Sequence, residues 1–263
     1  MRYISIYTGI LLFVLSSCSG YEKVLKSSDY NLKYKKAFEY YNKGDYTKAS
    51  GLFEQISTVF RGSNKSDTIN FYQAMSAYKE KDYVTAQYYF SSFSQTYSYS
   101  PFAEEAEYLA AYCLYLDSPN ASLDQESTFK GIEAFQSFMR KFPASKFYEK
   151  AKQCMIELQD KLVEKSYLSA KLYYKMGDIK LKSAIVALKS SLEEYPNTKY
   201  REEMMWLILD ANFKIAENSV ESKKKDRYQS TVDEYYSFIS EFPQSKWKDD
   251  ALKIYEKSEK LIK

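Results

Sequence analysis

The 263-residue chain contains no histidine, the side chain most often used as a general base or a metal ligand. Five prolines and seven glycines are too few for a fold with many tight turns, which argues against an all-β protein. Its 38 basic and 35 acidic residues nearly balance, so a strongly basic face for nucleic acid is not expected. Gly-rich phosphate loops, metal-ligand spacings and nucleophile motifs are also missing. We therefore expect no catalytic residues, no cofactor, no metal and no nucleic-acid partner.

Long apolar runs are scarce as well, and the clearest one lies at the N-terminus. Residues 4–15 are too few for a transmembrane helix, which needs about 20 residues, but they are typical of a signal-peptide core. The following Leu15-Ser16-Ser17-Cys18 resembles a bacterial lipobox, whose cysteine becomes the first mature residue and carries acyl chains. We predict a lipoprotein signal peptide at 1–17, lipidation of Cys18 and a lipidated tether at 18–28. An ordinary signal peptide with a chance cysteine is the alternative.

The residue after the cysteine bears on where the lipoprotein goes. It is Ser19 rather than aspartate, which by the usual sorting rule indicates the outer membrane. No acidic run of the kind linked to surface export follows. We expect a lipid-anchored protein of the outer membrane that faces the periplasm.

Cysteine is nearly absent from the rest of the chain. Cys113 and Cys154 both lie in helical patterns. An oxidising periplasm permits a disulfide between them, but we favour two buried free thiols.

Tyrosine is abundant, with 28 residues, and it recurs in a repeat. Six positions return after 37 residues: Ala37, Tyr40, Asp45, Tyr46, Ala49 and Phe53 reappear as Ala74, Ala77, Asp82, Tyr83, Ala86 and Phe90. Spacings of three and four place residues on one helix face, and Lys43-Gly44-Asp45 reads as a turn between two helices. The unit is a helical hairpin that resembles the tetratricopeptide repeat, in which small residues let the two helices approach closely.

The pattern continues to the C-terminus. The first helix of the third hairpin is predicted at 102–116. A loop insert at 117–127 follows, and the second helix of this hairpin lies around Ala134 and Phe138. A long helix, single or kinked, is predicted at 147–176, followed by helices at 181–194, 201–216, 228–241 and 248–262. Three helix ends carry an aromatic-Pro-x-Ser/Thr-Lys-aromatic signature, in which proline ends one helix and Ser or Thr caps the next. We predict an all-α superhelical solenoid of about five tetratricopeptide-like hairpins plus a C-terminal capping helix.

One face of the first three hairpins is rich in aromatic residues. Three positions per first helix recur at 37 residues, and all nine are aromatic or apolar: Tyr34, Phe38, Tyr41, Phe71, Met75, Tyr78, Tyr108, Tyr112 and Tyr115. Tyrosine and phenylalanine offer large rigid contacts at low entropic cost, which favours a groove for aromatic-rich extended peptides. The alternative is that these side chains belong to the core.

The lipobox, short tether and repeats together resemble the BamD family, lipoproteins of the outer-membrane β-barrel assembly machinery. The resemblance spans the mature chain, and two stretches carry it: Leu123-Asp124-Gln125 through Phe142-Pro143-Ala144-Ser145, and Leu158 through Tyr195-Pro196 and Thr198. It implies a BamA-type insertase as partner, bound through a POTRA domain mainly by C-terminal repeats 4–5 with the cap, at 147–263. It also implies that N-terminal repeats 1–3, at 29–146, receive the aromatic-ended C-terminal signals of unfolded outer-membrane proteins. Other assembly lipoproteins are further candidate partners.

Other functions are compatible with a tetratricopeptide lipoprotein. A Tol-Pal or cell-wall adaptor usually carries an N-terminal coiled coil, and heptads are missing before Asp29. Glycan-binding lipoproteins of starch utilisation have large inserts, whereas the clear insert here has eleven residues, 117–127. An enzyme is disfavoured because carboxylate pairs such as Glu104-Glu105 occupy adjacent helix positions, which do not face each other.

Overall fold

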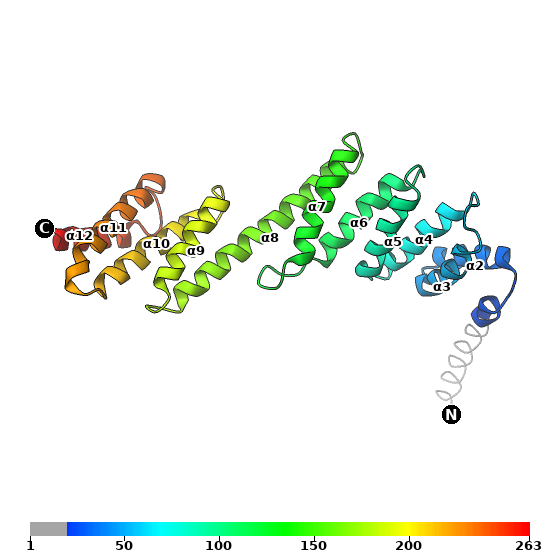
Figure 1. Ribbon diagram of the computed structural model, residues 1–263, viewed down its shortest axis with the longest axis horizontal. Coiled ribbons are helices and arrows are strands. Elements are labelled where there is room, and N and C mark those ends of the chain that lie inside the picture. The colour runs from blue at the N-terminus through cyan, green and yellow to red at the C-terminus, as the bar shows by residue number, and fades with distance from the viewer. Residues whose placement is uncertain (1–19) are drawn as a thin grey trace, which may run out of the picture. The chain divides into compact units, whose positions relative to one another are not determined.

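The computed structural model describes residues 20–263 as helices joined by short loops (Figure 1). Strands are absent from this part of the chain, which confirms the all-α prediction. A short helix at 20–25 precedes eleven longer ones: α2 Tyr30–Asn42, α3 Tyr46–Ser57, α4 Ser66–Lys79, α5 Tyr83–Thr96, α6 Ala103–Asp117, α7 Glu126–Lys141, α8 Tyr148–Lys175, α9 Leu181–Glu194, α10 Arg201–Glu217, α11 Glu221–Glu241 and α12 Lys248–Ile262. The predicted signal peptide and Cys18 lie outside the described residues.

The chain divides into two compact units. Unit 1 extends to Leu158 without residues 120–124, and unit 2 comprises residues 120–124 and 159–263. In unit 1 each helix from α2 to α7 packs on the next, and in unit 2 the same holds from α9 to α12. α8 is a single unbroken helix of 28 residues, and it contributes its first part to unit 1 and the remainder to unit 2. The consecutive packing of antiparallel hairpins is that of tetratricopeptide repeats.

The small and aromatic repeat positions form the core between the helices. Ala37, Ala49 and Phe53 are completely buried, as are Ala74, Ala86 and Phe90 one period later. Alanine at these positions lets helix backbones approach, while phenylalanine fills the space between hairpins. Gly131 on α7 serves the same purpose at a tighter crossing, since a Cβ there would lie 2.8 Å from Cδ1 of Leu158.

The predicted Ser and Thr caps are not the N-cap residues, because they lie two residues before that position. The hydroxyls of Ser145, Thr198 and Ser245 accept the backbone N–H two residues later, at 3.0, 3.2 and 3.1 Å. The regular helix starts after that aromatic residue, so the hydroxyl orders the turn that leads into the helix. Ser63 and Ser100 make the same bond, both at 3.2 Å, although neither follows a proline as in the signature.

One helix start was predicted wrongly. α11 begins at Glu221, seven residues before the predicted Tyr228. Its first two turns are rich in charged residues and carry no apolar periodicity, so the sequence pattern missed them. Lys224 forms an ion pair with Glu221 at 3.0 Å, which supports a solvated helix start. Cys113 and Cys154 are both buried and free, as favoured.

The described part of the expected tether is folded onto unit 1. Residues 20–25 form a helix, and Tyr21, Val24 and Leu25 pack against the core of the α2–α3 hairpin (dark blue in Figure 1). Helices of sufficient length and apolarity to cross a membrane do not occur among residues 20–263.

Candidate peptide-binding surface

The nine predicted contact residues lie on α2, α4 and α6, the first helices of three successive hairpins in unit 1. Within each helix they are spaced by four and then three residues, so they share one helix face. Because the hairpins repeat, the three faces continue from helix to helix. The members are Tyr34, Phe38 and Tyr41 on α2, Phe71, Met75 and Tyr78 on α4, and Tyr108, Tyr112 and Tyr115 on α6.

The structure buries these residues to different extents. Phe71 and Tyr108 are core residues, with 4% and 3% of their surface exposed. The other seven are half-buried. Hence no member projects freely into solvent, and a ligand would meet ring faces and edges that the protein already holds in place.

Two residues that sequence reasoning missed explain why Phe71 and Tyr108 are covered. Phe102 stacks on Phe71 with ring centroids 4.5 Å apart and an interplanar angle of 15°. Phe147 stacks on Tyr108 at 4.5 Å and 6°. Both covering rings stand two residues after a serine whose hydroxyl fixes the turn, so the turn bond positions the ring.

The first hairpin lacks this aromatic cover. Position 65 is one period before Phe102 (102 − 65 = 37), and there the chain has Lys65. Its ammonium lies 4.7 Å from the ring centroid of Tyr34, so a cation takes the place of a ring. Tyr34 therefore remains half-buried while Phe71 and Tyr108 do not.

Tyr72 is a further aromatic residue that the repeat pattern did not identify. Its ring centroid lies 4.9 Å from those of both Phe38 and Tyr41, which links the α2 face to α4. The residues one period away are Lys35 and Leu109, so no periodic signal could have indicated it.

The α6 residues form a column of nearly parallel rings. Tyr108 and Tyr112 meet at 5.7 Å and 18°, and Tyr112 and Tyr115 at 5.5 Å and 16°. The ammonium of Lys150 lies 5.0 Å from the centroid of Tyr112. The Tyr115 hydroxyl donates to the Glu157 carboxylate at 2.5 Å, which lowers the pKa of that carboxyl.

The tyrosine hydroxyls stay protonated well above neutral pH. Burial raises the pKa of Tyr41 to about 12, and the hydrogen bond to Glu157, with burial, raises the pKa of Tyr115 to about 12. Burial also raises the pKa of Tyr78, Tyr108 and Tyr112. Within residues 20–263 the buried hydroxyl of Tyr108 has no hydrogen-bond partner. The face thus offers neutral aromatic surface with hydroxyl donors, which suits an apolar, aromatic peptide better than a small charged substrate.

One of the three equivalent helix positions is charged in unit 2. At the constant offset of 133 residues, Tyr34, Phe38 and Tyr41 correspond to Tyr167, Lys171 and Tyr174. The Lys171 ammonium forms an ion pair with Glu203 at 2.6 Å and donates to the Tyr167 hydroxyl at 2.5 Å. These polar groups are satisfied within the unit.

A second charged network lies one helix further along. Asp210 on α10 accepts a hydrogen bond from the Tyr174 hydroxyl and forms an ion pair with Lys214 at 2.6 Å. Lys214 also donates to the Tyr174 hydroxyl at 2.7 Å. Each of the three groups thus has the other two as partners within unit 2.

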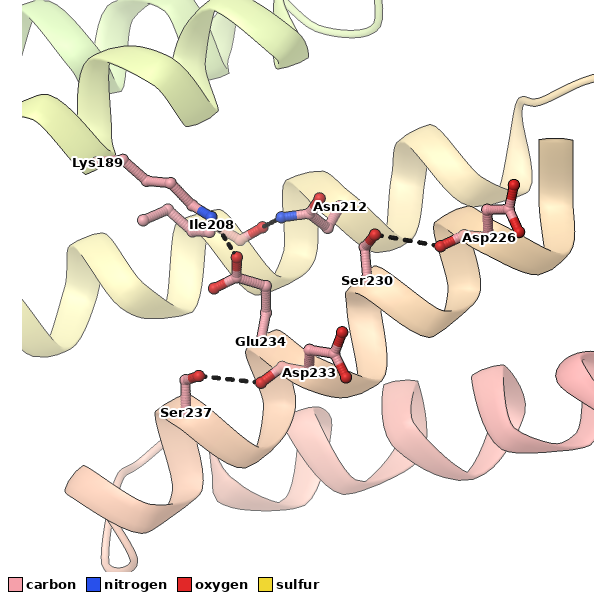
Figure 2. Close-up of polar contacts among 8 residues, drawn as sticks. All are labelled: Lys189, Ile208, Asn212, Asp226, Ser230, Asp233, Glu234 and Ser237. Carbon is pink, nitrogen blue, oxygen red and sulfur yellow. Dashed lines mark hydrogen bonds and ion pairs between the residues drawn. The ribbon is translucent and has the colours of Figure 1, made fainter.

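The second helices of unit 2 are likewise linked by internal polar contacts. Figure 2 shows Lys189 on α9 joined to Glu234 on α11, at 2.5 Å. Beside this pair the Asn212 side-chain amide donates to the carbonyl of Ile208 in the preceding turn of α10, at 2.9 Å. On α11, Ser230 and Ser237 donate to the carbonyls four residues earlier, at 3.1 and 3.0 Å. These contacts brace helices and provide no reactive group.

Comparisons with known proteins show which family the sequence matches. Residues 27–179 and 168–261 match the profile of YfiO, described as an outer membrane lipoprotein. The outer membrane protein assembly factor BamD of Pasteurella multocida is 25% identical over 236 residues, covering 85% of this chain and 89% of that protein. The putative factor of the same name from Aquifex aeolicus is 29% identical over 168 residues, 63% of this chain and 55% of that one. BamD of Neisseria gonorrhoeae is 24% identical over 222 residues, 81% and 79% of the two chains.

Proposed function

The chain belongs to the YfiO family of outer membrane lipoproteins, and from this premise we propose that it is a non-enzymatic subunit of the outer-membrane protein assembly machinery. The observation that carries the proposal is the family match, which extends from residue 27 to residue 261. In this proposal Cys18 carries the acyl anchor, and the folded chain faces the periplasm. No cofactor or metal takes part.

The first part of the proposal concerns substrates. The aromatic face of α2, α4 and α6 receives the C-terminal segments of unfolded β-barrel proteins, which end in an aromatic residue. Support comes from the neutral, partly accessible rings and from hydroxyls that stay protonated and can donate to a peptide backbone. A binding partner rich in aromatic residues would complete the ring contacts that the three helices begin.

The second part concerns the insertase. Residues 147–263 dock a BamA-type barrel protein through its POTRA domain. Support comes from exposed apolar side chains near the end of α8 and on α9, including Leu172, Met176, Ile179 and Val186, with Ile179 90% exposed. Exposed apolar groups of this density are typical of protein interaction sites.

Affinity purification tests the assembly role directly. The full chain, with its own signal peptide, is purified from membranes in mild detergent, and the proteins that accompany it are identified by mass spectrometry. We expect a large barrel protein with POTRA repeats, and Ile179→Glu should reduce its recovery while the chain stays in the membrane. Recovery of Pal-like or cell-wall proteins instead would contradict the assembly role and favour a periplasmic adaptor.

Peptide binding tests the aromatic face separately. The double variant Tyr41→Ala/Tyr78→Ala should weaken binding of an aromatic-ended barrel peptide by about tenfold or more, as loss of interface aromatic residues commonly does. Tyr88→Ala/Tyr99→Ala is the matched control, because both of these tyrosines are exposed and lie outside the face. Unchanged affinity in the first variant, with its helical signal retained, would contradict this assignment.

A further inference from the structure

The segment that follows the predicted lipidation site is seated in a notch of unit 1. The ring of Tyr21 lies 5.5 Å from that of Tyr40 and nearly perpendicular to it, and the Lys48 ammonium is 5.9 Å from its centroid. The notch exists because position 51 is glycine: a Cβ on Gly51 would lie 2.8 Å from the Tyr21 hydroxyl oxygen. Because this oxygen is the far end of a side chain, alanine at position 51 would require only a shift of the Tyr21 hydroxyl, whereas a larger residue would push the ring itself aside.

A buried lysine holds the other end of the same short helix. The Lys33 ammonium donates to the Leu25 carbonyl at 2.9 Å and to the Gln55 side-chain oxygen at 2.7 Å. Lys33 is only 5% exposed, and a buried ammonium is costly unless hydrogen bonds satisfy it. The segment therefore supplies a ligand that the folded hairpin needs.

These contacts fix the direction in which the chain leaves unit 1. Tyr21 lies beside Tyr40 and Lys48, which flank the loop between α2 and α3, whereas Leu25 lies further along the hairpin. Cys18 precedes Gly20 by two residues, and two residues span at most about 7 Å. The described chain, from Leu25 back to Tyr21, therefore runs toward the α2–α3 loop end of unit 1, and a lipidated cysteine two residues before Gly20 would be tethered within that distance.

That loop end carries three exposed lysines among acidic neighbours. The α2–α3 and α4–α5 loops are adjacent, because Thr47 donates to Glu80 at 2.9 Å. Among the described residues Lys43, Lys79 and Lys81 are exposed and form no ion pair, and the exposed Glu80 and Asp82 alternate with Lys79 and Lys81 along the chain. The nearby Asp45 is paired with Lys48 at 2.6 Å, and Asp82 caps α5 by accepting from the Thr85 N–H at 3.1 Å.

One of these lysines occupies a position that suits glycine. Lys81 has a φ of 63°, in the left-handed region, and the equivalent residue in the first hairpin is Gly44, with a φ of 81°. A residue with a side chain is less stable in this conformation than glycine. The α4–α5 turn therefore carries a positive charge together with a strained backbone.

We propose that the α2–α3 and α4–α5 loop end of unit 1 is a lipid-contact surface, at which Lys43, Lys79 and Lys81 meet anionic phospholipid headgroups. The seated segment 20–25 and the acyl chains hold this end against the membrane. Lysines near an anionic surface are attracted over roughly a Debye length, about 8 Å at physiological salt. The inference rests on the lipidation of Cys18 proposed above.

The opposite end of the first hairpin provides an internal reference. α3 has twelve residues and is about 18 Å long, so the α3–α4 loop, which includes Arg61, lies at the other end of the hairpin from the proposed contact. Spin labels are placed by Asn42→Cys or by Arg61→Cys on the full, lipidated chain. Cys113 and Cys154 are buried, and burial raises the pKa of the Cys113 thiol to about 12, so labelling favours the introduced cysteine.

The first experiment measures label relaxation in vesicles of phosphatidylethanolamine and phosphatidylglycerol that contain a nickel-chelating lipid. We expect several-fold faster relaxation at position 42 than at position 61. A chain that floats with the vesicles but relaxes equally at both positions overturns this inference and leaves the proposed function intact. A chain that does not float contradicts the lipid anchor itself, and this inference with it.

The second experiment tests the notch. Gly51→Leu should abolish the difference between the two labels while the chain still floats, because Tyr21 loses its seat. Gly51→Ala should reduce the difference, and Tyr21→Phe in the same chain should restore it, since phenylalanine lacks the oxygen that the new Cβ would meet. Glu54→Leu, at an exposed position of α3, is the matched control. A full difference in Gly51→Leu would overturn the role of the seated segment.

The third experiment tests the lysines. The triple variant Lys43→Gln/Lys79→Gln/Lys81→Gln should lower the relaxation rate at position 42 several-fold, and omitting phosphatidylglycerol should have the same effect on the unmodified chain. A rate that changes in neither case would overturn the lipid contact.

Discussion

The first helices of the two units carry the same repeat positions but different chemistry. In unit 1 the middle position of each triplet holds Phe38, Met75 or Tyr112. In unit 2 the equivalent position on α8 is Lys171, and Asp210 on α10 follows Trp206 at the same spacing. The charged side chains of unit 2 find their partners inside the unit, at 2.6 Å for both Lys171–Glu203 and Asp210–Lys214.

This difference shows that a helical repeat constrains the buried side of its helices far more than the adjoining face. Phe90 in unit 1 and Phe238 in unit 2 are both completely buried, although the neighbouring faces differ in charge. A face closed by ion pairs stabilises its own unit, whereas the face of unit 1 is neutral and aromatic, and its buried Tyr108 hydroxyl has no hydrogen-bond partner within residues 20–263.

The largest expected effect tests what the units share. Phe90→Ala in unit 1 and Phe238→Ala in unit 2 should each lower the free energy of unfolding by about 3–5 kcal/mol, because each leaves a cavity in a closed core. Urea unfolding followed by circular dichroism measures both. A loss well below this range in only one variant would show that the two cores are not packed alike.

The charged network of unit 2 should give a smaller effect. Asp210→Asn should lower the free energy of unfolding by about 1–2 kcal/mol, since the 15%-exposed carboxylate bonds both Tyr174 and Lys214. Glu157→Gln is the counterpart in unit 1, and its effect should stay within about 1 kcal/mol because Glu157 is exposed. Equal losses in the two variants would remove the proposed distinction between the faces.

Replacing Lys65 by an aromatic residue would give the first hairpin the stacked ring that the second and third hairpins have. Lys65→Phe should place a ring over Tyr34, as Phe102 covers Phe71, and should stabilise unit 1 by about 0.5–1.5 kcal/mol. If Tyr34 contacts the peptide, affinity should fall as stability rises, which thermal unfolding and peptide titration would reveal together. Lys35→Phe, at an exposed position of α2, is the control. Higher stability with unchanged affinity would assign Tyr34 to the core.

The smallest effect concerns alkaline pH. Burial raises the pKa of Tyr41 in the folded state to about 12, above the ordinary value of 10.0, so the unfolded chain releases this proton first. The associated stability is fully present below pH 10 and is lost as the pH rises through 12. Tyr41→Phe should therefore reduce the fall in unfolding free energy between pH 10 and 12. An unchanged slope, measured against Tyr88→Phe, would contradict the burial of the Tyr41 hydroxyl.

Much of the fold could be predicted from the sequence because local patterns encode it. The predicted bounds of the helix at 181–194 agree with α9, since the Gly177-Asp178 turn precedes its start and Pro196 follows its end. The start of α11 was missed because its charged first turns follow no apolar period. Repeat phase identified nine aromatic or apolar positions but not Tyr72, whose periodic equivalents are Lys35 and Leu109.

The sequence by itself determined the hairpins, their turns and the positions that form the core, because each depends on residues a few places apart. Only the tertiary structure decided which rings are covered, since Phe102 reaches Phe71 and Phe147 reaches Tyr108 across 31 and 39 residues of chain. It also decided that residues 20–25 are seated rather than free, because the notch at Gly51 exists only once α2 and α3 have packed. Such contacts depend on the distance and angle between helices, which no local pattern records.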